Sequence, residues 1–151
     1  MIWTWLRSLW DKFMGRSVDL QEETPDWSGV PKTLDEAVDQ LIKDTEGDEE
    51  LKDLLEKEES SFLGYLHFGG GMNMRNEWGF WNHEHPSDLA KWFHERGIYH
   101  ADDMSGIVYR TFYRRLKGED EAVQEQIENL RQYWRDQGQD PDRLFEPPQT
   151  N

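Results

Sequence analysis

The residues of this sequence that could carry out acid–base chemistry lie mainly in two stretches, residues 67–77 and residues 100–103. General acid–base catalysis needs a proton-transferring side chain, most often histidine or a carboxylate, within hydrogen-bond reach of the substrate. A small enzyme could therefore be built from His67, Glu77 and His100. Neighbouring polar residues enlarge this set to a candidate polar pocket with aromatic walls, made of His67, Arg75, Asn76, Glu77, His100, Asp102 and Asp103.

A second interpretation of the same region is structural. Arg75 and Glu77 stand among methionines and aromatic residues in the stretch FLGYLHFGGGMNMRNEWGFW, residues 62–81. Charged groups in such surroundings are usually paired, because burying a lone charge is very costly. We therefore expect an internal Arg75–Glu77 pair that fixes the packing of this segment. No Gly-x-Ser-x-Gly elbow or paired-carboxylate signature accompanies the histidines, and we assign no catalytic residue.

The sequence gives little support for a metal ion or a cofactor. His83 and His85 flank Glu84 in a turn, but they lack the His-Glu-x-x-His spacing that places two ligands on one helix face. The chain has no cysteine, which excludes disulfides, thiolate zinc sites and iron–sulfur clusters. The three glycines at 69–71 lack the Gly-Lys-Ser/Thr ending of a phosphate loop. We expect no metal site and no cofactor.

The charge distribution indicates what kind of partner the chain could bind. Its 151 residues carry a formal net charge of −15, and fifteen acidic against four basic residues between Glu22 and Glu59 give that stretch a net of −11. Direct nucleic-acid binding requires clustered Lys and Arg and is not expected. The acidic residues either form a solvated surface or bind a basic protein partner. The candidate acidic face consists of Asp35, Asp39, Glu49, Glu50, Asp53 and Glu56.

The first sixteen residues are predicted to form an amphipathic helix, because Ile2, Leu6, Leu9 and Phe13 follow helical spacing. Such a helix could pack on the domain, dock on a protein partner, or lie on a membrane surface, where tryptophans favour the interface. No stretch is long enough to cross a bilayer, and no signal peptide is recognisable. We expect a cytoplasmic protein, with peripheral contact at the inner face of the membrane as an alternative. The candidate docking residues are Trp3, Trp5, Trp10 and Phe13.

The remaining pattern predicts an all-α fold, a compact single-domain bundle of about five to seven helices. Helical periodicity and caps place helices after Thr33, at residues 48–59, after Ser87, at residues 101–117 and at residues 120–137. The glycines at 69–71 predict a break, a tight turn, or a close approach of another helix or a ligand. We divide the chain into an N-terminal helix (1–16), a linker (17–31), a helical domain (32–137) and a Pro-rich polar tail (138–151).

Particular side chains in these elements have expected positions. Because aromatics make up 13% of the chain and each removes a large area from water, we expect a core dominated by Trp, Phe and Tyr. Trp27 could hold the linker on the domain, and Leu144 or Phe145 could dock the tail. His94 is expected on the exposed side of its helix and His100 at the entry to the next. That next helix is expected to bury Met104, Ile107, Val108, Phe112 and Leu116.

Three stretches carry a resemblance: LHFG at 66–69, RNEWGFW at 75–81 and GIYHADDMSG at 97–106. Over roughly residues 30–118 the chain resembles a small bacterial and phage protein family catalogued only as a domain of unknown function. Here Ala101 stands where that family typically has proline. The resemblance implies domain limits and a bacterial or phage source, and it implies no activity. The N-terminal helix and the helix after Gly118 are then additions to the family domain.

These features favour a non-enzymatic protein-interaction module, for example a phage- or mobile-element-encoded inhibitor or accessory factor that acts on a host protein. One alternative is a peripheral membrane-surface protein anchored by the Trp-rich N-terminal helix. The other is the small enzyme that uses His67, Glu77 and His100.

Overall fold

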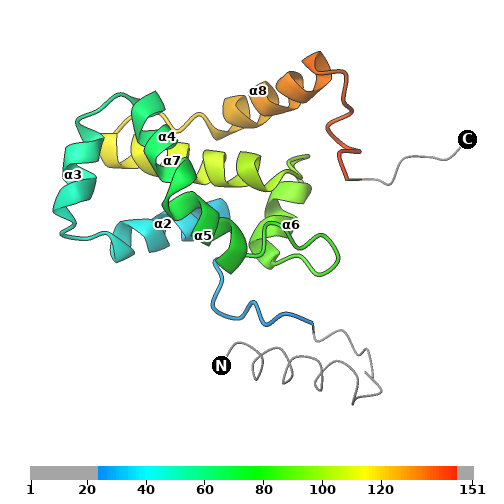
Figure 1. Cartoon of the computed structure of the whole chain (residues 1–151), viewed down its shortest axis with the longest axis horizontal. Coiled ribbons are helices and arrows are strands. Elements are labelled where there is room, and N and C mark those ends of the chain that lie inside the picture. The colour runs from blue at the N-terminus through cyan, green and yellow to red at the C-terminus, as the bar shows by residue number, and fades with distance from the viewer. Residues whose placement is uncertain (1–23, 146–151) are drawn as a thin grey trace, which may run out of the picture.

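The computed structural model describes residues 24–145, and this part of the chain consists of helices joined by turns (Figure 1). No strand occurs within these residues. The prediction of an all-α, single-domain bundle of five to seven helices is therefore confirmed. In chain order the helices are α2 (Leu34–Asp44), α3 (Glu49–Leu55), α4 (Glu59–Phe68), α5 (Gly70–Glu77), α6 (Asp88–His94), α7 (Ala101–Lys117) and α8 (Val123–Asp136).

Helix α7 is the element against which most of the others pack. It contacts α2, α4, α5 and α8, and Figure 1 shows it running through the middle of the molecule. The predicted bounds of this helix are confirmed. The expected burial of Leu116 is wrong, since this side chain is 37% exposed and lies in the last turn beside an open groove between α2 and α3. The other four expected side chains are buried: Met104, Ile107, Val108 and Phe112.

The buried aromatic side chains are phenylalanine and tyrosine. Phe62 packs against Tyr113 with ring centroids 4.9 Å apart, and Phe80 packs edge-on against Phe93 at 5.8 Å. The expectation that tryptophan would share the core is met only in part within residues 24–145: every tryptophan there is half-buried or exposed, but Trp78 and Trp92 pack against the core. The indole N–H explains part of this placement, because a buried indole needs a hydrogen-bond acceptor and an indole at the surface finds one easily.

Side-chain caps set where four of the helices begin, and α2 and α6 are two of them. Thr33 Oγ1 accepts a hydrogen bond from the Glu36 N–H at 3.2 Å, as the capping box predicts, while the Glu36 carboxylate binds the N–H of Lys32 in place of that of Thr33. The predicted cap of α6 is also confirmed, because Ser87 Oγ accepts from the Ala90 N–H at 3.1 Å. Ser87 is fully buried, and its hydroxyl also donates to the carbonyl of the α5-terminal residue Trp78 at 2.7 Å. This one side chain therefore links the start of α6 to the end of α5.

Two helix boundaries differ from those predicted from the sequence. The helix expected at 48–59 is capped by Asp48 as its start requires, but α3 ends at Leu55 and α4 begins at Glu59. The turn between α3 and α4 is held by a residue of α7, because the Tyr113 hydroxyl donates to the Lys57 carbonyl at 2.9 Å. Helical periodicity cannot predict such a long-range contact. The helix expected at 120–137 begins later, at Val123.

The glycine-rich segment separates α4 from α5. Gly69 ends one helix and precedes the next with φ −99° and ψ −102°, so the predicted break is confirmed. The next two glycines lie inside α5, where they allow close packing on α7. A Cβ atom on Gly70 would lie 3.1 Å from the Tyr109 hydroxyl, and one on Gly71 would lie 2.8 Å from the Leu66 carbonyl oxygen. The predicted close approach of another helix is therefore confirmed as well.

Replacing Gly71 by alanine should destabilise the protein. The added methyl group meets backbone on one side and the Tyr109 ring on the other, so the helices must separate, at a cost of about 1–3 kcal/mol. Gly64 provides a matched control in the middle of α4, because a Cβ atom there meets nothing within 4 Å. Gly64→Ala should stabilise the protein by up to about 1 kcal/mol. Urea denaturation measures both changes, and a Gly71→Ala protein as stable as wild type would contradict the packing argument.

Candidate functional site

The polar residues singled out in the sequence gather around Arg75, whose side chain is buried between α5 and α7. It is 5% exposed, and its Nε lies 3.2 Å from Asp102 Oδ1 in an ion pair. Its two terminal nitrogens donate to Ser105 Oγ at 3.1 Å and to the His67 carbonyl at 3.4 Å. All three stretches that carry the family resemblance meet in this cluster. The groups around Arg75 use its charge and its hydrogen-bond donors to hold α4, α5 and α7 together.

The expected Arg75–Glu77 pair is wrong. Glu77 is exposed at the end of α5, and the partner of Arg75 comes from α7. Residues two apart on a helix point in different directions, so helix geometry disfavours such a pair. Asn76 is also exposed and does not join the cluster. Sequence reasoning missed Ser105, although it lies within the GIYHADDMSG stretch.

His100 and Asp103 form the edge of the cluster at the start of α7. The Nδ1 atom of His100 accepts a hydrogen bond from the Asp102 N–H at 3.1 Å, which confirms its expected place at helix entry. Asp103 Oδ2 accepts from the Trp134 indole N–H at 2.7 Å, and burial raises the pKa of this carboxyl above its ordinary value. This hydrogen bond ties α8 to α7 and was not predicted from the sequence.

The three residues of the enzyme hypothesis do not contact one another. The ring of His67 packs edge-on against Phe68, Glu77 is exposed, and the ring of His100 packs against Trp81 and Trp134. Within residues 24–145 no hydrogen bond, ion pair or ring contact joins any two of the three. Nor do three or more His, Asp or Glu side chains of this part of the chain come together in the manner of a metal site.

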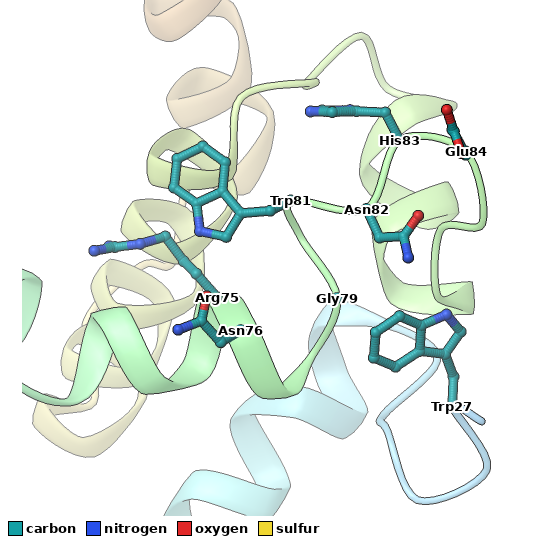
Figure 2. Close-up of a pocket in the computed structure, with 8 residues that line it drawn as sticks. All are labelled: Trp27, Arg75, Asn76, Gly79, Trp81, Asn82, His83 and Glu84. Carbon is teal, nitrogen blue, oxygen red and sulfur yellow. The ribbon is translucent and has the colours of Figure 1, made fainter. Parts of the chain in front are cut away.

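A cleft of about 590 Å³ opens beside the cluster (Figure 2). Figure 2 shows Trp81 and Trp27 on either side of the chain at Gly79, and Arg75 beside Trp81 with its guanidinium directed away from Trp27. Gly79 has φ +71°, and a Cβ atom there would lie 2.6 Å from the Trp27 ring, so this indole packs directly on the backbone. The residues lining the cleft are Trp27, Arg75, Asn76, Gly79, Trp81, Asn82, His83 and Glu84.

Two hydrogen bonds hold the turn that closes the cleft. The Trp27 indole N–H donates to the His85 carbonyl at 2.8 Å, so the expectation that Trp27 holds the linker on the domain is confirmed. The Asn82 side-chain oxygen accepts from the His85 N–H, also at 2.8 Å. The position of one wall of the cleft is therefore set by a residue nearly sixty positions away in the sequence.

A stack of aromatic rings lies on the other side of this turn. His94 stacks on Tyr99 with centroids 5.1 Å apart and on His83 at 6.5 Å, and His83 stacks on Phe145 at 4.1 Å. Phe145 also lies 5.9 Å from His100, so the expected docking of the tail through Phe145 is confirmed. The expected exposure of His94 is wrong: the side chain is half-buried and its Nε2 is shielded from solvent, because Tyr99 and His83 stack on its ring.

The acidic face is exposed but not wholly free. Asp35 and Asp39 both bind Arg115 of α7, at 2.7 and 3.0 Å, and Glu50 accepts a hydrogen bond from the Tyr65 hydroxyl. The sequence analysis did not single out the large apolar side chains that lie in solvent close to this face. They are Tyr65 and Phe68, three residues apart on α4, and Met72 on α5, which are 51%, 81% and 55% exposed.

The N-terminal candidates Trp3, Trp5, Trp10 and Phe13 lie outside the described residues, so their docking and the membrane-surface role remain predictions. Among residues 24–145, no helix combines the length and apolar character needed to span a membrane.

Replacing Arg75 by methionine should cost about 2–4 kcal/mol of unfolding free energy. The variant leaves the Ser105 hydroxyl and the Asp102 carboxylate without their buried partner, although Asp102 keeps access to water. Arg135→Met removes an exposed pair with Glu128 and should change stability by less than about 1 kcal/mol. Equal losses in the two variants, measured by urea denaturation, would show that the Arg75 cluster does not hold the helices.

Acidification should weaken the ring stack. Burial lowers the pKa of His94 and of His83, and the nearby charges of His83 and His100 respectively lower them further. The unfolded chain then binds more protons than the folded one. The stabilisation is therefore complete above about pH 6.5 and is lost as the pH falls through the lowered values. Between about pH 7.5 and pH 5, wild type should lose more unfolding free energy than His94→Phe, which keeps the ring without the charge. Parallel pH profiles of the two proteins would contradict this.

The comparison with known proteins identifies a family by its sequence. No curated protein and no solved structure gives a match. A family model described as "Domain of unknown function (DUF6794)" matches residues 30–116, which is more than half of the chain. The matched segment contains α2 to α6, nearly all of α7 and the whole Arg75 cluster, and it ends before α8. The resemblance noted in the sequence is thereby confirmed, and the chain belongs to the DUF6794 family.

Proposed function

We propose that this chain is a non-enzymatic protein-interaction domain that binds its partner through the apolar side chains of α4 and α5. We call the exposed Tyr65, Phe68 and Met72 the α4–α5 surface. The proposal rests mainly on the exposure of Phe68 to solvent, which is 81%. Single apolar side chains in solvent are common, but here Tyr65 and Phe68 lie one turn apart on α4 and Met72 follows on α5, and several exposed apolar side chains close together in the chain are typical of a contact site.

The charges around the α4–α5 surface favour a basic partner. Residues 44–59, which contain α3, include nine acidic and two basic residues. The hydrogen bond from Tyr65 to Glu50 brings this acidic segment to the edge of the apolar side chains. A partner with apolar anchors and flanking Lys or Arg matches both features, and opposite charges also speed the encounter of two proteins.

The hydrogen bonds made by the polar residues of the three family stretches support binding rather than catalysis. Arg75 donates to Ser105 and to the His67 carbonyl and pairs with Asp102, Asp103 accepts from Trp134, and His100 uses one ring nitrogen to cap α7. A catalytic group needs a hydrogen bond left over for its substrate. The finer part of the proposal is a bacterial or phage source and a role as an inhibitor or accessory factor, encoded by a phage or mobile element, that acts on a host protein.

Replacing Phe68 by serine should release the partner. Affinity purification of the tagged full-length chain from its source cells, with mild crosslinking and quantitative mass spectrometry, measures the recovery of each bound protein. Phe68→Ser and Met72→Ser should each reduce recovery of the partner by about tenfold or more, the effect expected for a central apolar contact. Tyr133→Ser is the matched control, because Tyr133 is 53% exposed on α8.

The proposal predicts loss only at the α4–α5 surface, with all three variants as stable as wild type. Equal recovery from Phe68→Ser and Tyr133→Ser, or the absence of any specifically enriched protein, would overturn it.

A further inference from the structure

We propose that the cleft lined by Trp27 and Trp81 binds an arginine side chain of a protein partner. The inference rests on the proposed function, since it assumes that the partner is a protein, and it adds a second contact with a defined chemistry. The cleft is large enough for one side chain at about 590 Å³, and none of its lining residues belongs to the α4–α5 surface.

The walls of the cleft suit a flat cation. Trp81 is 45% exposed, and Trp27 is held in place by Gly79 beneath its ring and by the hydrogen bond of its N–H to the His85 carbonyl. Indole faces attract cations more strongly than other aromatic rings, and guanidinium stacks on them particularly well. This molecule already contains such a pair, because the guanidinium carbon of Arg96 lies 3.7 Å from the centre of the Trp92 ring.

The charge left in the cleft is negative. Arg75 lines the cleft, but it is nearly buried, its charge is matched by Asp102, and Figure 2 shows its guanidinium directed away from Trp27. Burial holds the pKa of His83 below its ordinary value, so this ring is neutral at pH 7. Glu84 is exposed and supplies the remaining charge among the lining residues. An anion would meet Glu84 without a free cation to offset it, so the cleft favours a positive ligand.

Amide oxygens can complete the site. Asn76 is exposed at the rim, and its side chain makes no hydrogen bond within residues 24–145, so its oxygen is available to a donor. Asn82 keeps one lone pair free beyond the bond that it accepts from His85. A guanidinium has five N–H donors in a fixed plane, which lets it stack on an indole and donate to amide and carboxylate oxygens together. Lysine offers no such plane, and we therefore commit to arginine.

The test is a titration of the ¹⁵N-labelled full chain followed by NMR. The probe is N-acetyl-arginine amide, and the matched control is N-acetyl-citrulline amide, which has the same shape without the charge. The indole N–H signals of Trp27 and Trp81, assigned from Trp→Phe variants, report on the two walls. We expect both signals to shift in a saturable way with the arginine probe and not with the citrulline control.

Two substitutions locate the site. Trp81→Leu should weaken the binding of the arginine probe by about two- to fivefold, the factor that one lost cation–π contact represents. Glu84→Gln should weaken it as well, and Glu95→Gln, an exposed acid outside the cleft, should not. The Trp27 indole signal and an unchanged melting temperature check that each variant is folded.

Each result decides the inference. Saturable arginine shifts that Trp81→Leu weakens support it. Equal shifts with arginine and citrulline, no shift up to the solubility limit, or shifts unaffected by Trp81→Leu overturn it. Failure here is distinguishable from failure of the proposed function, because capture of a partner that depends on Phe68 does not require the cleft.

Discussion

The fold depends on one long helix that supports several short ones. α3 and α6 have seven residues, α5 has eight, and even α2 has eleven, whereas α7 has seventeen. Isolated helices shorter than about 12–15 residues are marginal in water, so these helices owe their stability to packing. The basic end of α7 also holds the acidic helices, since Arg115 binds Asp35 of α2 and Arg114 binds Glu59 of α4. An acidic chain thus gathers its scarce arginines where its carboxylates would otherwise repel one another.

Local patterns in the sequence predicted those features of the fold that depend on interactions between neighbouring residues. The bounds of α7, the Thr33 and Ser87 caps and the break at Gly69 all follow from periodicity, capping and glycine chemistry within a few residues. Contacts over longer distances could not be predicted in this way. The partner of Arg75 lies 27 positions away on α7, and His94 is covered by residues of two different turns. The gathering of the three family stretches could be suspected from the sequence, but the identity of each hydrogen bond depends on how the helices pack.

The family stretches serve two purposes at once. Their inward side chains, Arg75, Asp102 and Ser105, tie α5 to α7. Their outward side chains include Phe68, which is 81% exposed on the α4–α5 surface, and Trp81, which is 45% exposed in the cleft. A motif of this kind fixes the backbone from within and thereby sets the positions of the exposed groups, which are the proposed contacts for a partner. Rigid presentation lowers the entropy lost on binding, because the contact residues are already in place.

Helix α3 is attached to the domain by few interactions. Leu54 is its one buried side chain, while Leu51 and Leu55 pack against the core partly buried. The other links are the hydrogen bond from the Tyr65 hydroxyl to Glu50 and one from the Lys117 ammonium to the Leu55 carbonyl at 3.0 Å. Opening α3 alone therefore costs a small part of the free energy needed to unfold the whole domain. The amides of α7, in contrast, exchange with solvent only when the whole domain opens. Opening of α3 therefore leaves the packing of α2, α4, α5 and α8 on α7 in place. In the interaction proposed above, the carboxylates of α3 would then meet the protein partner from a range of orientations and not from one fixed position.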